Sequence, residues 1–193
     1  MGSQANAPAC ELLERGAQAA LERKDFRGAL TFLMRAYGTE VYRLCIDLVG
    51  DPHGAEDLLQ TVFVQAFESF PRYVPRSTLR AWLHGIARNR CLDALRGRRR
   101  WRLMEVPEEL PEPVDPGPSG EDRLSALERK NALEDCLQRL PPKARQSVHL
   151  RFRAQLSYDE MSEICGEQTG TLRVRVARAM PLLRRCLEEK GSP

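Results

Sequence analysis

The feature that most constrains this 193-residue chain is a segment that cannot fold on itself. Residues 104–122 contain seven acidic residues and five prolines, with no lysine or arginine. Prolines interrupt helices and strands, and the acidic side chains repel one another, so we expect a flexible linker here. This linker divides the chain into an N-terminal and a C-terminal module.

The N-terminal module has the apolar periodicity of amphipathic helices. Apolar residues recur every three or four positions over 26–48, 55–70 and 79–95, which predicts three helices. Gly50-Asp51-Pro52 separates the first two, and Ser77 is a candidate N-cap for the third. Residues 1–25 are expected to form a short helical or frayed extension of unknown role.

The C-terminal module contains the pattern of a helix-turn-helix. Two helices are expected over 124–140 and 143–153, and Ser157 and Glu160 have the spacing of a capping box that starts a third. A glycine-bearing turn over 166–170 precedes a basic last helix, and a short helix, a turn and a basic helix typify DNA-binding proteins. The residues expected to face inward on the last helix are Leu172, Val176, Met180, Leu183 and Leu187.

No segment shows sustained strand alternation, so we predict an all-α protein with two small helical domains joined by the flexible acidic, proline-rich linker. The predicted boundaries are an N-terminal extension at 1–25, a first domain at 26–103, the linker at 104–122 and a second domain at 123–190.

The positive charge is concentrated in both domains, although the formal net charge is only +3. Residues 72–102 hold ten arginines against one acidic residue, and residues 139–185 hold ten basic residues against four acidic ones. Such local density is typical of surfaces that bind nucleic acid.

Other classes of function are disfavoured by what the sequence lacks. The six cysteines are widely spaced without a CxxC pair, so we interpret them as small buried residues and expect neither a disulfide framework nor a zinc site. Common phosphate-binding, metalloprotease and hydrolase motifs are missing, and we expect no catalytic residues, metal or cofactor. No apolar run is long enough to span a bilayer, so we expect a cytoplasmic protein without direct membrane insertion.

Several motifs together resemble one family. They are Gly50-Asp51-Pro52 with the run AEDLLQ at 55–60, the run IARN at 86–89 before the arginine cluster, the run LSYDE at 156–160, and Gly170-Thr171. Over residues 26–188 the chain resembles the extracytoplasmic function (ECF) sigma factors of the bacterial sigma-70 family. The resemblance implies a protein that binds core RNA polymerase and promoter DNA, reads the minus 10 and minus 35 elements with its two domains, and helps to open the duplex. It also implies an anti-sigma partner, and a linker that runs through the RNA channel of the polymerase; a merely solvated linker is the alternative.

The resemblance assigns roles to three groups of residues. Those implied to bind core polymerase are Glu56, Asp57, Gln60 and Phe63. Those implied to bind minus 10 DNA are Tyr73, Arg76, Arg88, Asn89, Arg96, Arg98, Arg99 and Arg100. Those implied to bind minus 35 DNA are Thr171, Arg173, Val174, Arg175, Ala177 and Arg178. Within these groups, Asn89 would hold a flipped base, the alternative for Tyr73 is a place at the edge of the core, and Arg175 is either structural or a phosphate ligand.

Two other functions compete with this interpretation. A free-standing helix-turn-helix regulator would explain the C-terminal module, but not the polar helix at 55–70 or the linker. A DNA-processing enzyme would need a cluster of carboxylates or a nucleophile beside arginines, and the sequence offers neither.

Overall fold

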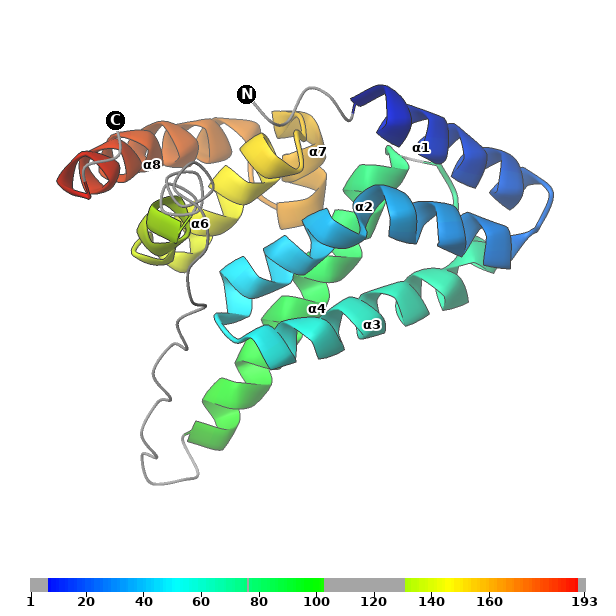
Figure 1. Cartoon of the computed structure of the whole chain (residues 1–193), viewed down its shortest axis with the longest axis horizontal. Helices are drawn as coiled ribbons and strands as arrows, with labels where there is room; N and C mark the ends of the chain where they lie inside the picture. Colours follow the sequence, from blue (N-terminus) through cyan, green and yellow to red (C-terminus); the bar gives the residue numbers. More distant parts are fainter. Residues whose placement is uncertain (1–6, 76, 103–130, 191–193) are drawn as a thin grey trace, which may run out of the picture.

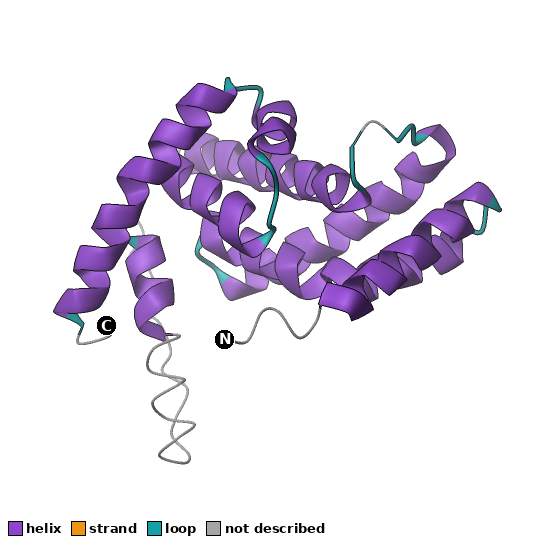
Figure 2. Cartoon of the chain, turned by 90° about the horizontal axis from the view of Figure 1, so that it is seen from above, coloured by secondary structure: helices purple, strands orange, loops and turns teal. Residues whose placement is uncertain are grey.

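The structure is a computed structural model that describes residues 7–75, 77–102 and 131–190, with side chains described for 10–75, 77–97 and 131–190. The predicted linker at 104–122 and Arg76 lie outside the described residues. The described chain is helical, with no strand in these ranges, as predicted (Figures 1 and 2). None of the helices in these ranges is both long and apolar enough to cross a membrane.

The N-terminal unit (residues 7–102) consists of α1 (Ala7–Glu22), α2 (Phe26–Val49), α3 (Pro52–Ser69), the short 3-10 turn η1 (Phe70–Arg72) and α4 (Leu79–Arg102). Gly50 ends α2 in the left-handed conformation, with φ of 71°, where glycine carries no steric penalty. Asp51 then caps α3 by accepting hydrogen bonds from the backbone N–H groups of His53 and Gly54. The predicted break between these two helices is therefore confirmed.

The start of α4 differs from the prediction by one residue. The hydroxyl of Thr78, rather than that of Ser77, accepts from the backbone N–H of Ala81 at 3.2 Å, and the Thr78 carbonyl accepts from the Trp82 N–H. Thr78 is therefore the N-cap. Both residues have a side chain suited to capping, so the composition alone did not distinguish them.

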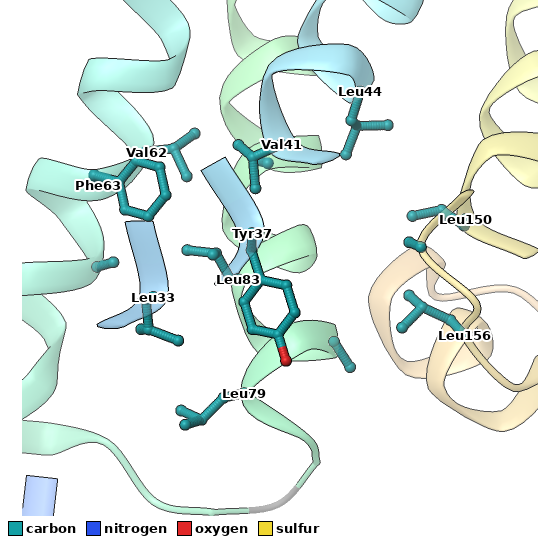
Figure 3. Packing of buried hydrophobic residues seen from close by; sticks show 14 of the residues in the cluster. Leu33, Tyr37, Val41, Leu44, Val62, Phe63, Leu79, Leu83, Leu150 and Leu156 are labelled. Carbon is teal, nitrogen blue, oxygen red and sulfur yellow. The ribbon is translucent and has the colours of Figure 1, made fainter. Parts of the chain in front are cut away.

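The core of the N-terminal unit forms where α2 packs against α1, α3 and α4. Figure 3 shows Leu33, Tyr37 and Val41 of α2 facing Leu79 and Leu83 of α4. These five side chains are almost fully buried, and a buried Leu or Val side chain contributes about 1.5–3 kcal/mol. The N-terminal extension, whose role the sequence left open, contributes to this core through α1, where Ala17 and Ala20 are buried.

The C-terminal unit (residues 131–190) consists of a helix over 131–138, α6 (Pro142–Val148), a π-helical turn η2 (His149–Arg153), α7 (Tyr158–Cys165) and α8 (Thr169–Glu189). The predicted capping box is confirmed: the Glu160 N–H donates to the Ser157 hydroxyl, and the Ser157 N–H donates to the Glu160 carboxylate. Gly166 ends α7 in the left-handed conformation, which completes the helix-turn-helix.

One inward residue of α8 was wrongly predicted. The buried stripe is Leu172, Val176, Ala179, Leu183 and Cys186, whereas Met180 is 42% exposed. The buried positions alternate between steps of four and three residues, so Ala179 takes the place assigned to Met180.

The interpretation of all six cysteines as unpaired buried residues is also wrong. Cys136 and Cys186 form a disulfide that joins the helix over 131–138 to the end of α8, while the other four cysteines are free. The two cysteines are 50 residues apart in sequence. The helix-turn-helix folds back between them and brings them together, which their spacing could not show.

The two units share one apolar seam. Leu150, Leu156 and Met161 of the C-terminal unit belong to the same buried cluster as Leu33, Leu44 and Leu83 of the N-terminal unit. Figure 3 shows Leu150 and Leu156 beside the packing of α2 and α4. A second, smaller core holds the helix over 131–138 against the end of α8 and includes Leu137, Leu140 and Leu183. The C-terminal unit is therefore stabilised from two sides.

Candidate nucleic-acid interface

The helix α3 presents a polar face to solvent. Glu56, Asp57 and Gln60 are exposed, at positions that follow one side of the helix, and Val64 continues this side with 56% of its surface exposed. Phe63, predicted to bind core polymerase, is instead 5% exposed and packs in the core. Its side chain therefore orients α3 and has almost no surface to offer a partner.

The predicted minus 10 residues with described side chains lie along α4. Asn89 and Arg96 are exposed. Asn89 accepts a hydrogen bond from Arg88 at 3.2 Å, and Arg96 pairs with Asp93 at 3.2 Å. The Arg88–Asn89 bond leaves the amide NH₂ group of Asn89 free to donate. The side chains of Arg98, Arg99 and Arg100, which continue this helix, lie outside the described residues.

The loop before α4 is built on an aromatic cluster. Tyr73 and Trp82 meet edge to face with ring centroids 4.9 Å apart, and Phe70 lies 5.9 Å from Trp82. Tyr73 is half-buried, and burial raises the pKa of its hydroxyl. Tyr73 is thus anchored at the edge of the core, which was the alternative to a role in binding minus 10 DNA.

Beside this cluster the loop borders an open cavity of about 400 Å³. Tyr73, Val74 and Trp82 line it, together with the polar residues Glu68, Ser69, Arg72 and Ser77. A cavity with aromatic walls and a few polar groups suits a flat ring that hydrogen-bonds at its edges. Asn89 lies on the same side of α4 as Trp82, two turns or about 10 Å further along the axis.

The helix α8 carries the predicted minus 35 residues. Thr171, Arg173, Val174, Ala177 and Arg178 are all exposed, on the side away from the buried stripe. Val174 is 49% exposed, so an aliphatic group stands at the centre of this surface. An aliphatic group can contact a thymine methyl but cannot donate a hydrogen bond to a base.

Arg175 differs from the other arginines of α8. Its guanidinium forms a two-pronged ion pair with Glu167 and also donates to the Ser147 hydroxyl at 3.4 Å. The hydrogen bonds from Arg175 hold the pKa of the Glu167 carboxyl below its usual range. Arg175 thus ties α8 to α6 and to the turn before α8, which supports the structural one of the two roles left open by the sequence.

Polar contacts cross the seam between the two units. Thr78 donates to the Glu160 carboxylate at 2.7 Å, and Arg80 donates to the Ala154 carbonyl at 3.3 Å. Although burial alone would raise the pKa of Glu160, the hydrogen bonds from Thr78 and Ser157 hold it below its usual range. Arg88 donates to the Cys165 carbonyl at 3.5 Å, so a predicted minus 10 residue is engaged by the C-terminal unit.

Comparisons with known proteins bear on both units. The Sigma-70 region 2 family matches residues 33–101, and the Sigma-70 region 4 family matches residues 130–183. CarQ of Myxococcus xanthus, an RNA polymerase sigma factor, is 35% identical over 135 residues, and the match covers 70% of this chain and 75% of CarQ. SigE of Mycolicibacterium smegmatis, an ECF RNA polymerase sigma factor, is 36% identical over 160 residues. The chain belongs to the ECF sigma factors of the sigma-70 family.

The match to SigE covers 83% of this ECF sigma factor and 62% of SigE. Among solved structures, the sigma factor RpoE, in complex with the anti-sigma factor NepR from Bartonella quintana, is similar with a TM-score of 0.65 and 26% identity. That similarity covers 86% of this chain and 98% of the RpoE chain. The predicted all-α fold with two helical domains and the predicted family are therefore confirmed.

Two groups of contact residues in this ECF sigma factor were not predicted from its sequence. Asp47 and His149 are fully or almost fully buried at the seam, and nothing in their sequence surroundings marks them as partners. Tyr158 contacts arginines on either side of it in the sequence, Arg151 and Arg173. Tyr158 stands in the run LSYDE, which was interpreted as a helix start and as a family motif, but no role was predicted for its ring.

Proposed function

We propose that this chain is an alternative sigma factor that binds core RNA polymerase and directs promoter recognition, DNA melting and transcription initiation as a non-catalytic factor. The observation that carries the proposal is the pairing of two surfaces in one N-terminal unit, the exposed polar face of α3 and the arginine-bearing face of α4. A free-standing regulator needs the helix-turn-helix of α7 and α8 but has no use for a polar docking helix.

In this proposal Glu56, Asp57 and Gln60 contact core polymerase. Asn89 and the cavity beside Tyr73 and Trp82 receive an unstacked base of the minus 10 element, because an amide can donate and accept at a base edge while aromatic walls support the ring. Arg96, Arg98, Arg99 and Arg100, together with Arg76, neutralise phosphates near this element.

The C-terminal unit reads the minus 35 element in the major groove. Arg173 and Arg178 are the base-reading candidates, since an arginine can make two hydrogen bonds to a guanine edge. Thr171, Val174 and Ala177 supply the surface between them. An anti-sigma protein is proposed as a further partner, in view of the similarity to RpoE bound to NepR, and we place the sigma factor in the cytoplasm, where core polymerase acts.

The test is co-purification of the full chain with core polymerase. The wild-type chain should be retained by immobilised core polymerase, and Glu56→Lys with Asp57→Lys should reduce retention. Arg184→Glu, on an exposed part of α8 away from these faces, is a control for altered surface charge and should be retained like the wild type. Equal retention of all three proteins would contradict docking through α3, and no retention of the wild type would contradict the proposed function itself.

A further inference from the structure

Tyr158 occupies the first helical position of α7, directly after the Ser157 cap, and its ring contacts two guanidinium groups. The guanidinium carbons of Arg151 and Arg173 each lie 5.2 Å from the ring centroid. This distance is within the range in which a cation is attracted to the face of an aromatic ring. Tyr158 therefore joins the π-helical turn η2 to the proposed recognition helix α8.

The two arginines differ in how they are held. Arg151 also donates to the Leu156 carbonyl at 2.9 Å, so it is fixed to the loop before α7. Arg173 is exposed, and within the described residues its guanidinium has the Tyr158 ring as its contact. Arg178, five residues further along α8 and therefore about 140° around the helix from Arg173, has no such ring contact among the described side chains. Of the two base-reading candidates, Arg173 is thus the preorganised one.

Stacking and base reading use different parts of a guanidinium. A guanidinium that lies face-on over an aromatic ring is attracted through its flat face, whereas a guanine is recognised by the N–H groups at the guanidinium edge, in its plane. A stacked arginine can therefore donate two hydrogen bonds to a base while it keeps its aromatic contact. The contact with Tyr158 also limits the rotamers of Arg173 before DNA binds. Arg173 therefore loses less rotamer entropy on binding, which lowers the entropic cost of recognition.

We propose that Tyr158 is a positioning residue that sets base specificity in the minus 35 element by holding the guanidinium of Arg173. The proposal rests on the proposed sigma function, and it adds to the helix-turn-helix a specificity residue that lies on α7 rather than on the recognition helix. The competing role for Tyr158 is a purely structural one, in which the Arg173 contact only fastens α7 to α8.

The experiment uses holoenzyme assembled from core polymerase and the full chain. Duplexes are enriched from a library randomised over the upstream promoter element, and relative affinities are measured for every single-base variant of the enriched sequence. Arg173→Ala first identifies the base position at which preference is lost. Tyr158→Leu should then lower the preference at that same position by about two- to five-fold, because one exposed cation–π contact contributes a free energy of this size. Tyr158→Phe keeps the aromatic ring and should largely retain the preference.

Double substitutions separate positioning from a structural role. Tyr158→Leu should have no further effect on base preference in an Arg173→Ala background, but its full effect in an Arg178→Ala background. Should the leucine variant lose its helical circular dichroism signal, Tyr158→Met fills the same half-buried site without a ring face and is measured in its place.

The outcomes are distinct. If the wild-type chain confers no promoter-specific binding on core polymerase, the proposed function fails before any variant is compared. If it does, and the Tyr158 variants weaken binding equally at all positions or leave base preference unchanged, the positioning role of Tyr158 is overturned.

Discussion

The imidazole of His149 lies against the carboxylate of Asp47, with 2.5 Å between Nδ1 and Oδ2, and this contact joins residues 102 positions apart in two different units. Both side chains are buried, and Arg153 approaches the same carboxylate oxygen at 3.4 Å. Arg153 also pairs with Glu134 at 2.8 Å. The charge of Asp47 is therefore compensated across the seam, by the C-terminal unit.

This relationship predicts that Asp47→Asn weakens the seam. The substitution removes the carboxylate that His149 and Arg153 share, and leaving a buried polar group such as the His149 imidazole without its partner costs about 1–3 kcal/mol. We expect a lower free energy of unfolding and a larger radius of gyration by small-angle X-ray scattering. Replacing Asp47 and His149 together by leucine should cost less than the single change, since it removes both polar groups. The control is Asp93→Asn, because Asp93 is exposed on α4. If Asp47→Asn and Asp93→Asn had the same free energy of unfolding and the same radius of gyration, a stabilising role of Asp47 at the seam would be refuted.

The disulfide predicts a redox-dependent stability of the C-terminal unit. A bridge that closes a loop of 50 residues restricts the unfolded chain and contributes about 4 kcal/mol. Dithiothreitol should therefore lower the denaturant midpoint followed by far-UV circular dichroism. Cys136→Ala with Cys186→Ala should be insensitive to the reductant. Without reductant, alkylation of the denatured wild type should label Cys10, Cys45, Cys91 and Cys165; labelling of Cys136 or Cys186 would contradict the bridge.

His84 predicts a loss of stability on acidification. Its ring is fully buried in α4, donates to the Arg80 carbonyl at 2.9 Å, and lies near Glu40 and His149. Burial, with smaller contributions from the positive charges nearby, lowers the pKa of His84 from 6.5 to about 3. Between these values the unfolded chain binds a proton that the folded chain does not, so stability present above the unfolded pKa is lost as the pH falls.

The measurement is the free energy of unfolding between about pH 6.5 and 5, where carboxyl groups contribute little. The wild type should lose stability by up to about 1.4 kcal/mol per pH unit more than His84→Gln does. Parallel pH profiles for the two proteins would show that His84 is not held neutral in the fold.

The arginines of α8 should divide into two classes. Arg178→Ala should cost about 1–3 kcal/mol of holoenzyme binding at one base position if Arg178 reads a guanine. Arg175→Ala should instead lower thermal stability and leave base preference unchanged, because it leaves Glu167 without its ion-pair partner. Base-position profiles and melting curves of the two variants test this division, and a change of preference in Arg175→Ala would return Arg175 to the DNA interface.

Local features of the fold were predictable from the sequence, and long-range ones were not. The periodicity of α2 and the spacing of Ser157 and Glu160 depend on residues within a few turns, so they could be inferred directly. The Cys136–Cys186 bridge depends on how helices fold back on one another. Periodicity over α8 favoured Met180 as an inward residue because Met is apolar, although the packing of the helix selects Ala179.

For the candidate site, the exposed faces were predictable and the roles of single residues were not. Arg173 and Arg175 are both basic residues of one helix, and the sequence left open whether Arg175 is structural or binds phosphate. In the structure Arg173 lies over the ring of Tyr158 and Arg175 pairs with Glu167, so their contacts with the preceding helix and turn differ. Phe63 likewise shares its motif with Glu56 and Asp57 but lies in the core.

The most direct test of sigma function compares promoter binding by the chain alone and by the chain with core polymerase. In the isolated chain the seam holds Arg88 against the Cys165 carbonyl, and the two units that are proposed to bind DNA are packed together. The assay is an electrophoretic mobility shift on a duplex taken from the region upstream of the gene that encodes this chain. The chain alone should bind this duplex weakly and without sequence specificity. Once core polymerase is added, binding should be specific, and competitor DNA should not displace it. Tight, sequence-specific binding by the isolated chain would contradict the sigma function and favour a free-standing regulator.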